Sequence, residues 1–153
     1  MSFDKAKSHL EKFGFGGRVR VFDVSSATVE LAAEAAWVEP ARIAKTLSFD
    51  APDGCILVVT AGDMKVNNAK FKAEFGIKPR MLTPDKVGEK TGHEVGGVCP
   101  FGVNDGAGVY LDVSMQRFDT VYPACGSANS SVRLSCEELF LCSGAVRWVD
   151  VCV

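Results

Sequence analysis

Histidine is scarce in this sequence, and its cysteines are not arranged as metal ligands. The 153 residues include two histidines, His9 and His93, and six cysteines at irregular intervals without any Cys-x-x-Cys pair. Zinc sites require closely spaced Cys and His ligands, so we expect neither a metal site nor a cofactor. Cysteines spaced in this way are typical of reduced thiols that pack as small apolar residues, which indicates a cytoplasmic protein.

Long apolar runs and a strong net charge are also absent. No segment approaches the ~18 apolar residues of a membrane span, and the first seven residues have no apolar core, so we expect no membrane anchor and no signal peptide. The formal net charge is −2, so any contact with nucleic acid must come from a local basic patch. The length fits a single domain over residues 1–153, without repeats or linkers.

The most distinctive segment of the sequence is a glycine-rich stretch. Residues 92–102 read GHEVGGVCPFG, with four glycines and one proline in eleven residues. Glycine allows a backbone to approach a ligand closely, and proline restricts both itself and the preceding residue. The composition predicts a shaped loop whose amide groups line a ligand site. The alternative is a bulged hairpin that binds nothing.

Helical and strand patterns alternate along the whole chain. Apolar periodicity and capping residues predict helices over 2–13, 29–38, 66–75, 84–91 and 135–142. Alternating or continuous apolar runs predict strands over 18–23, 45–49, 55–61, 109–113, 119–125, 132–134 and 146–153. Several of the links between strands look like hairpins. We therefore predict an α+β fold with a mixed or antiparallel sheet.

One segment is locally basic. Seven lysines and arginines lie between residues 65 and 90, and the predicted helix 66–75 and its N-terminal flank carry three of them: Lys65, Lys70 and Lys72. These three are candidates for contact with tRNA phosphates. The alternative is an ordinary solvated helix face.

Four segments in a fixed order resemble the YbaK/prolyl-tRNA synthetase-associated domain family, whose members trim mischarged aminoacyl-tRNA. The segments are a lysine-bearing strand (41–49), the glycine-rich loop (92–102), a late strand with a Gly-Ser turn (121–127), and a closing strand and helix (132–139). Together they span nearly the whole chain. None of the four is specific alone, but their order is.

The resemblance implies both a fold and an activity. The fold would be a largely antiparallel, crumpled barrel-like mixed sheet with helices outside. The activity would be that of a free-standing hydrolase that cleaves the ester of mischarged tRNA, with a small amino acid such as Ala, Ser or Cys on tRNA(Pro) or a similar tRNA. Its partner would be aminoacyl-tRNA, with prolyl-tRNA synthetase as a candidate second partner and no membrane. The alternative is a module that binds tRNA or a synthetase without catalysis.

The resemblance also assigns site residues. Lys45 stands at the position of the family's central lysine; its ammonium would position the substrate or stabilise charge, and otherwise it is an ordinary surface lysine. The expected backbone donors to an oxyanion belong to two glycine turns: Gly96, Gly97 and Val98 in the first, and Gly126 and Ser127 in the second. The Ser127 hydroxyl would orient the substrate or a water.

Five residues of the loop are expected to bind substrate: His93, Val98, Cys99, Pro100 and Phe101. His93 is otherwise a structural histidine. A third hypothesis makes Cys99 a nucleophile with His93 as its base.

Overall fold

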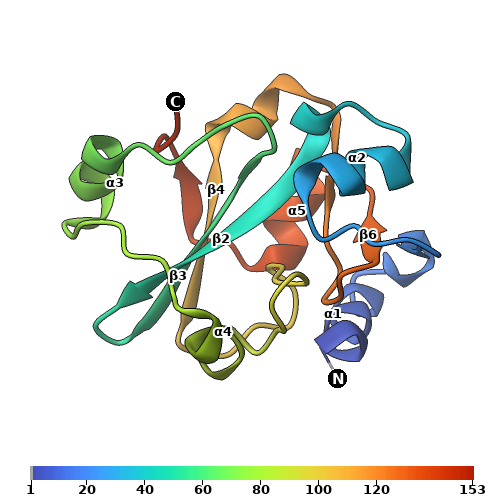
Figure 1. The fold of residues 1–153 in the computed structure, drawn as a ribbon, viewed down its shortest axis with the longest axis horizontal. Helices are drawn as coiled ribbons and strands as arrows, with labels where there is room; N and C mark the ends of the chain where they lie inside the picture. Colours follow the sequence, from blue (N-terminus) through green and yellow to red (C-terminus); the bar gives the residue numbers. More distant parts are fainter. Residues whose placement is uncertain (1) are drawn as a thin grey trace.

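The computed structural model describes residues 2–153, which form an α+β fold (Figure 1). Its helices are α1 (Ser2–Glu11), α2 (Val29–Ala36), α3 (Asn68–Phe75), α4 (Pro84–Thr91) and α5 (Cys136–Ser143). Its strands are β1 (Val19–Val21), β2 (Ile43–Ala51), β3 (Gly54–Ala61), β4 (Ala107–Asp112), β5 (Thr120–Pro123), β6 (Ser130–Val132), β7 (Leu134–Ser135) and β8 (Arg147–Val149). None of the helices in this range is long and apolar enough to cross a membrane.

The strands form a six-stranded sheet of order β7-β5-β2-β3-β4-β8 and a two-stranded sheet, β1-β6. The long β2–β3 hairpin crosses the middle of the molecule and pairs antiparallel from Ala44–Ala61 to Ala51–Gly54. The predicted α+β fold with a mixed sheet is confirmed. Its antiparallel share is smaller than expected, because β2–β5, β3–β4 and β4–β8 are parallel. Parallel neighbours need long crossover connections, and α3 and α4 lie in the one between β3 and β4.

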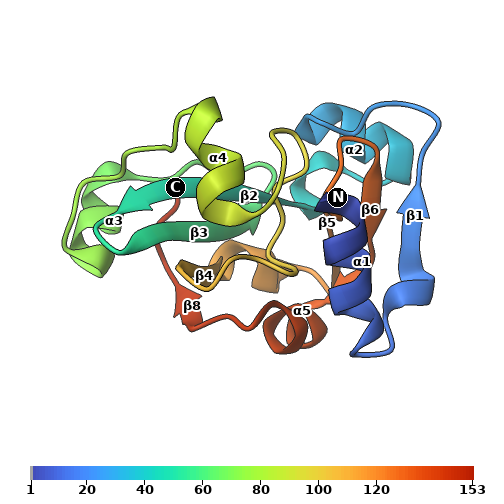
Figure 2. The ribbon, with the colours of Figure 1, turned by 90° about the horizontal axis from the view of Figure 1, so that it is seen from below.

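The strand predicted over 132–134 is divided into the end of β6 and the start of β7, because the chain changes sheets at Arg133. β6 pairs with β1, whereas β7 pairs with β5, and the exposed Arg133 lies between them. Figure 2 shows β1 and β6 beside α1 at one end of the molecule. The strand predicted over 146–153 is reduced to β8 and an isolated bridge from Cys152 to Val66.

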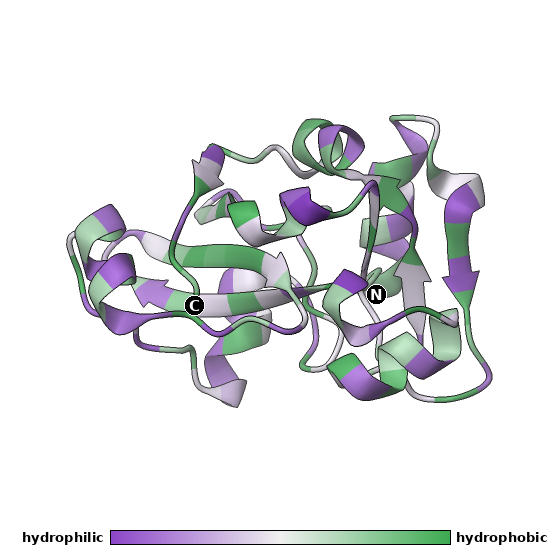
Figure 3. Ribbon diagram, turned by 90° about the horizontal axis from the view of Figure 1, so that it is seen from above, coloured by the Kyte–Doolittle hydropathy of each residue, from purple (hydrophilic) through white to green (hydrophobic). Residues whose placement is uncertain are grey.

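The smallest of the three core clusters in residues 2–153 joins Ala32 and Ala33 of α2 to Ile43 of β2, and two larger clusters hold the other helices on the sheet. The larger contains the inward residues of β3, such as Leu57 and Val59, together with residues of α1, α4 and α5. The smaller packs Phe71 of α3 against Phe49 and Val58. Figure 3 shows hydrophobic residues along the central strands and both hydrophilic and hydrophobic residues on the outer helices. Burial of apolar side chains from helix and sheet is the main stabilising contribution in such a layered fold.

Local signals set two helix boundaries that matter for the site. α4 begins with Pro84 at its first position and ends at Gly92, whose φ is +86°. α5 begins with a capping box, in which the Ser135 hydroxyl accepts from the amide of Glu138 and the Glu138 carboxylate accepts from the amide of Ser135. Both starts were predicted from the sequence.

Candidate active-site cavity

A cavity of about 400 Å³ lies where β2, α2, α4 and the glycine-rich loop meet. Most of its lining is apolar, including Val29 and Ala32 of α2, Val87 of α4 and Leu82. Among residues 2–153, the only charged residue in the lining is Lys45. Such a cavity, apolar with a few polar groups, is typical of small-ligand sites.

The cavity opens at a gap in the pairing of β2. On the edge that faces β5, β2 pairs with β5 at Ile43 and Ala44, and its next bridge on that edge joins Phe49 to Met81. Further along, the Ser48 carbonyl accepts from the amide of Leu82. Thr46 lies between these two contacts and lines the cavity. The unpaired edge therefore provides room for a ligand beside the strand.

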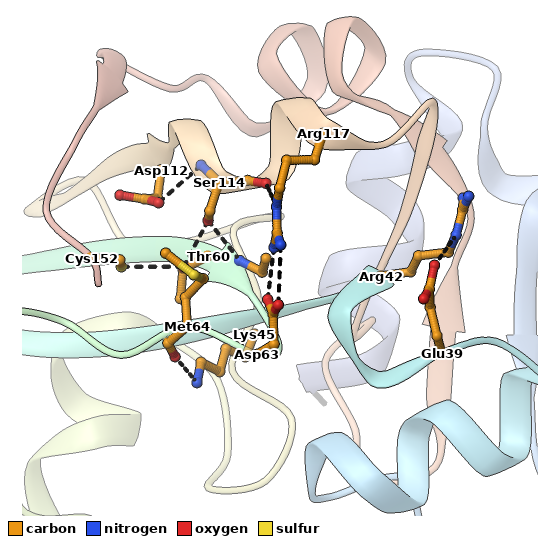
Figure 4. A network of polar contacts seen from close by, with 11 residues as sticks. Glu39, Arg42, Lys45, Thr60, Asp63, Met64, Asp112, Ser114, Arg117 and Cys152 are labelled. Atoms are coloured by element: carbon orange, nitrogen blue, oxygen red, sulfur yellow. Dashed lines mark hydrogen bonds and ion pairs between the residues drawn. The ribbon is translucent and has the colours of Figure 1, made fainter.

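Lys45 is half-buried on β2 and is held from the neighbouring loop. Its Nζ donates to the main-chain oxygen of Met64 at 2.5 Å (Figure 4). An ammonium group has three donors, so two remain for other partners. The side chain is thus anchored at a defined place rather than extended freely into solvent.

The loop that holds Lys45 is itself fixed by an ion pair. Asp63, next to Met64, accepts two hydrogen bonds from the Arg117 guanidinium at 2.7 and 3.1 Å. Arg117 also donates from Nε to the main-chain oxygen of Ser114 (Figure 4). The hydrogen bond from Arg117 lowers the pKa of Asp63, and Lys45 contributes in the same direction. Two-point Arg–carboxylate contacts restrict geometry strongly, so this pair positions the Met64 carbonyl.

The structure brings the two glycine turns together. Gly96 and Val98 line the cavity. A side chain on Gly97 would place its Cβ 2.5 Å from the amide nitrogen of Ser127 and 2.6 Å from the carbonyl carbon of Gly126. Gly97 therefore allows the backbones of the two turns to touch. Among residues 2–153, the amides of Gly96 and Val98 have no hydrogen-bond acceptor.

Two of the predicted amide donors are already engaged. The amide of Gly97 donates to the Glu94 carbonyl at 3.0 Å, and the amide of Gly126 faces the Cys99 sulfur. The loops therefore use these two amides in their own hydrogen bonds. The Ser127 hydroxyl bonds to Asn129 and to the Ser130 hydroxyl. Ser130 lines the cavity, so Ser127 lies directly behind it.

His93 is a structural residue and not part of the cavity wall. It is 1% exposed, its Nε2 lies 2.6 Å from the Phe101 carbonyl, and its Nδ1 lies 2.8 Å from the Ser2 hydroxyl. A carbonyl only accepts, so Nε2 carries the hydrogen and Nδ1 accepts from Ser2. Both ring nitrogens are thus used inside the protein, and the structure places His93 outside the cavity lining.

The side chains of Cys99, Pro100 and Phe101 also point away from a ligand. Cys99 and Phe101 are completely buried in the larger core cluster, and Pro100 is buried too. Burial raises the pKa of the Cys99 thiol far above its ordinary value. A buried protonated thiol is not a nucleophile. Of the five expected substrate contacts, only Val98 lines the cavity, and the burial of Cys99 does not support the thiol mechanism.

The burial of His93 gives a test by pH. Desolvation lowers the pKa of His93 below 6.5, against the opposing effect of the Phe101 carbonyl. Below about pH 6.5 the unfolded chain therefore binds a proton that the folded chain does not, and stability falls as pH falls towards the lowered pKa. We expect the melting temperature of His93→Gln to depend less on pH between about 7.5 and 5.5 than that of the wild type. Equal slopes for the two proteins would contradict the buried neutral imidazole.

Only part of the basic segment is available for contact with tRNA. Lys70 pairs with Asp150 at 3.1 Å and donates to the Cys152 carbonyl. Lys65 and Lys72 are exposed and form no ion pair within residues 2–153. Lys65 follows Met64, which holds Lys45. Of the three candidates for tRNA contact, Lys65 and Lys72 have no such partner, whereas Lys70 shares its charge with Asp150 in an exposed ion pair.

Sequence reasoning missed several residues around the cavity. Asp63 and Arg117 are 54 positions apart and carry no motif. The hydroxyls of Ser26, Thr46 and Ser131 lie around the cavity without standing out in composition. Thr46 carried no signal either, because neighbouring residues of a strand point to opposite faces and Thr46 directly follows Lys45 on β2. No group of three or more Cys, His, Asp or Glu in the described part of the chain could hold a metal.

Known proteins resemble this chain in sequence. Residues 23–141 match the family model of the aminoacyl-tRNA editing domain. The chain is 50% identical over 153 residues to the uncharacterized protein YwhH of Bacillus subtilis (strain 168), covering 99% of this chain and 98% of that one. It is 35% identical over 78 residues to the proline–tRNA ligase of Thermotoga sp. (strain RQ2), covering 50% of this chain and 14% of the ligase.

Solved structures agree with the fold. A putative trans-editing enzyme for prolyl-tRNA synthetase superimposes with a TM-score of 0.88 at 31% identity, covering 98% of this chain and 96% of that one. The hypothetical protein APE2540 superimposes with a TM-score of 0.85 at 29% identity, covering 97% and 99%.

Proposed function

This chain belongs to the aminoacyl-tRNA editing domain family, and from that premise we propose that it is a hydrolase that removes a small amino acid from mischarged tRNA. One observation carries the proposal: the half-buried Lys45 and the unpartnered amides of Gly96 and Val98 line the same cavity. Negative charge develops on the ester oxygen during hydrolysis. A fixed cation and free amides in a largely apolar site stabilise that charge. A tRNA(Pro) or similar tRNA is the proposed carrier, since relatives include proline–tRNA ligases.

The proposed step is hydrolysis of the ester that joins the amino acid to the terminal ribose. The oxygen of a water bonds to the ester carbonyl carbon, and the bond from that carbon to the ribose oxygen breaks. One proton of the water goes to the solvent, and the ribose oxygen takes up a proton. The products are a free amino acid and a tRNA with its terminal ribose intact.

Each site residue has a role in this step. Lys45, held by the Met64 carbonyl, places positive charge near the ester oxygen or the terminal phosphate. The amides of Gly96 and Val98 donate to the oxygen on which charge develops, each worth about 2.7–4 kcal/mol in comparable sites. Ser127 supports the wall through Ser130. Asp63 and Arg117 act as positioning residues, because they hold the loop that anchors Lys45.

The cavity also suits selection by size. A synthetase pocket separates similar apolar side chains by only about 1–3 kcal/mol, so a second site that admits the smaller side chain improves accuracy. α2 and α4 narrow the cavity with Val29, Ala32 and Val87. We propose that these residues set the upper limit on the side chain that the cavity admits.

The experiment that tests the proposal is amino acid release from a panel of mischarged tRNAs. We expect at least one alanyl-, seryl-, cysteinyl- or prolyl-tRNA to lose its amino acid much faster with the protein than in buffer. Salt-dependent tRNA binding without release of any amino acid would instead favour a non-catalytic binding module, with prolyl-tRNA synthetase as a candidate partner.

The exposed lysines of the basic segment provide a separate prediction. We expect the double variant Lys65→Gln/Lys72→Gln to bind tRNA more weakly and to reduce the slope of log affinity against log salt by up to about 2, because each phosphate contact releases a counterion. Lys70→Gln is the matched control, since Lys70 is already paired with Asp150. Filter binding at several salt concentrations measures both. An unchanged slope in the double variant would exclude this face as the tRNA contact.

A further inference from the structure

Asp112, the last residue of β4, is a buried carboxylate to which the proposed hydrolysis gives no role. It is 1% exposed. One of its oxygens accepts from the amide of Ser114 at 3.0 Å, and the other accepts from the amide of Val151 at 2.9 Å. Hydrogen bonds from backbone amides offset the cost of burying such a group. Asp112 therefore joins two elements, the short helix η3 (Val113–Arg117) and the segment 151–153.

The helix η3 fastens one side of the loop that anchors Lys45. Its last residue, Arg117, makes the two-point contact with Asp63. Its Ser114 hydroxyl accepts from the amide of Ala61, the last residue of β3, at 3.3 Å. Figure 4 shows Ser114 and Arg117 together on one side of Lys45. The start of the loop and its acidic residue are thus held by the same short helix.

The segment 151–153 fastens the other side of the same loop. Lys65 and Val153 exchange two backbone hydrogen bonds, of 3.1 and 2.8 Å. The carbonyl that accepts from Lys45 belongs to Met64, which directly precedes Lys65. This carbonyl is therefore flanked on both sides by residues that distant parts of the chain hold in place.

The two fastening elements also meet at Thr60, which lies opposite Lys45 in the β2–β3 hairpin. Thr60 is completely buried, and its hydroxyl lies 3.2 Å from the Ser114 hydroxyl and 3.3 Å from the Cys152 sulfur. Displacement of either element would disturb the backbone opposite Lys45 as well as the loop that holds its side chain.

We infer that Asp112 is a positioning residue for Lys45. Its two hydrogen bonds set the spacing of the two elements that hold the Met64 loop, and the loop holds the Lys45 ammonium. A displacement of about 1 Å at a reacting group can cost a factor of about 10² in rate, so a residue outside the cavity lining can have a large effect. The inference rests on the function proposed above, in which Lys45 acts on the substrate.

The test uses two variants that loosen this arrangement at different points. Asp112→Asn keeps the shape of the side chain but replaces one acceptor oxygen by a donor, which opposes one of the two amides. Val153→Pro removes the amide that donates to the Lys65 carbonyl, at an exposed position. Two matched controls accompany them. Asp150→Asn removes an exposed carboxylate nearby, and Val153→Ala keeps the backbone amide.

The first readout is single-turnover release from the tRNA that the panel shows to be cleaved. At saturating protein we expect Asp112→Asn to be slower by about 10–100-fold and Val153→Pro to be slower severalfold, with both controls at the wild-type rate. The protein concentration for half-maximal rate should not change, because the cavity lining is intact. In a Lys45→Met background neither variant should slow release further, since a residue that acts through Lys45 has no effect once Lys45 is gone.

The second readout does not depend on hydrolysis. Peptide mass spectrometry follows the acetylation of Lys45 by N-acetoxysuccinimide, well below the melting temperature of each protein. Exposed Lys12 of the same chain is the internal reference. An anchored, half-buried ammonium should react slowly, and both variants should increase the rate at Lys45 relative to Lys12, whereas both controls should leave the ratio unchanged.

Each outcome decides the inference. Wild-type release and unchanged acetylation in the variants would overturn it but keep the proposed hydrolase. Slower release by the same factor in the Lys45→Met background would also overturn it, because the effect would not pass through Lys45. Faster acetylation of Lys45 in the variants, without hydrolysis of any ester by the wild type, would support the positioning role and reject the proposed catalysis. If Asp112→Asn does not fold, Val153→Pro decides between these outcomes, since it breaks the same series of contacts one step later.

Discussion

Lys45→Met is expected to slow release of the amino acid by about 10²–10³-fold while the protein remains folded. The variant removes the only charge in the cavity lining and keeps an unbranched side chain of similar length. Loss of one preorganised electrostatic contact to a developing oxyanion typically has this size. The fold should persist because Lys45 is only half-buried and its apolar stem is replaced by another.

The measurement is the single-turnover rate at saturating protein with one mischarged tRNA, together with the melting temperature. Lys12→Met is the matched control, since it makes the same change at an exposed position outside the basic segment. A wild-type rate for Lys45→Met would remove the lysine from the mechanism. A large fall in melting temperature would show that Lys45 is mainly structural.

Gly97→Ala is expected to lower the melting temperature by roughly 2–12 °C and to impair activity as well. The new methyl group would lie 2.5–2.7 Å from backbone atoms of Ser127 and Gly126, which cannot rotate away as a side chain could. Overpacking of this kind costs about 1–3 kcal/mol, and a domain of this size loses about 2–4 °C per kcal/mol. The two turns must separate to accept the methyl, and Gly96 and Val98 would move with them.

Thermal denaturation and the single-turnover rate measure the two effects together. Gly17→Ala is the control, because a methyl group there meets nothing within 4 Å and Gly17 does not have a positive φ. That variant should be as stable as the wild type or slightly more so. Gly97→Ala with unchanged stability and rate would show that close contact of the two turns is not needed.

Much of the fold was predictable because its signals are local. The apolar run of β3, Pro84 at the start of α4 and the Ser135–Glu138 capping box depend on a few adjacent residues. The parallel pairings and the change of sheet at Arg133 depend on partners that are distant in the sequence. Periodicity shows which face of a strand is apolar but does not identify the neighbouring strand.

The site was predictable to the level of segments but not of atoms. Lys45, Gly96 and Val98 do line the cavity. His93 and Cys99 attracted attention as reactive residue types, yet they are buried behind the loop and support it. Whether an amide such as that of Gly97 is free depends on loop geometry, and the Asp63–Arg117 pair joins positions that no pattern connects.

The most direct test of this account follows a single charged tRNA(Pro) through the reaction in water labelled with ¹⁸O. For the amino acid that the panel shows to be released, the account predicts rapid release by the wild type and slow release by Lys45→Met. One ¹⁸O should enter the carboxylate, and the tRNA should be fully rechargeable afterwards. Release at the buffer rate with the wild type, or equal rates for the two proteins, would contradict it.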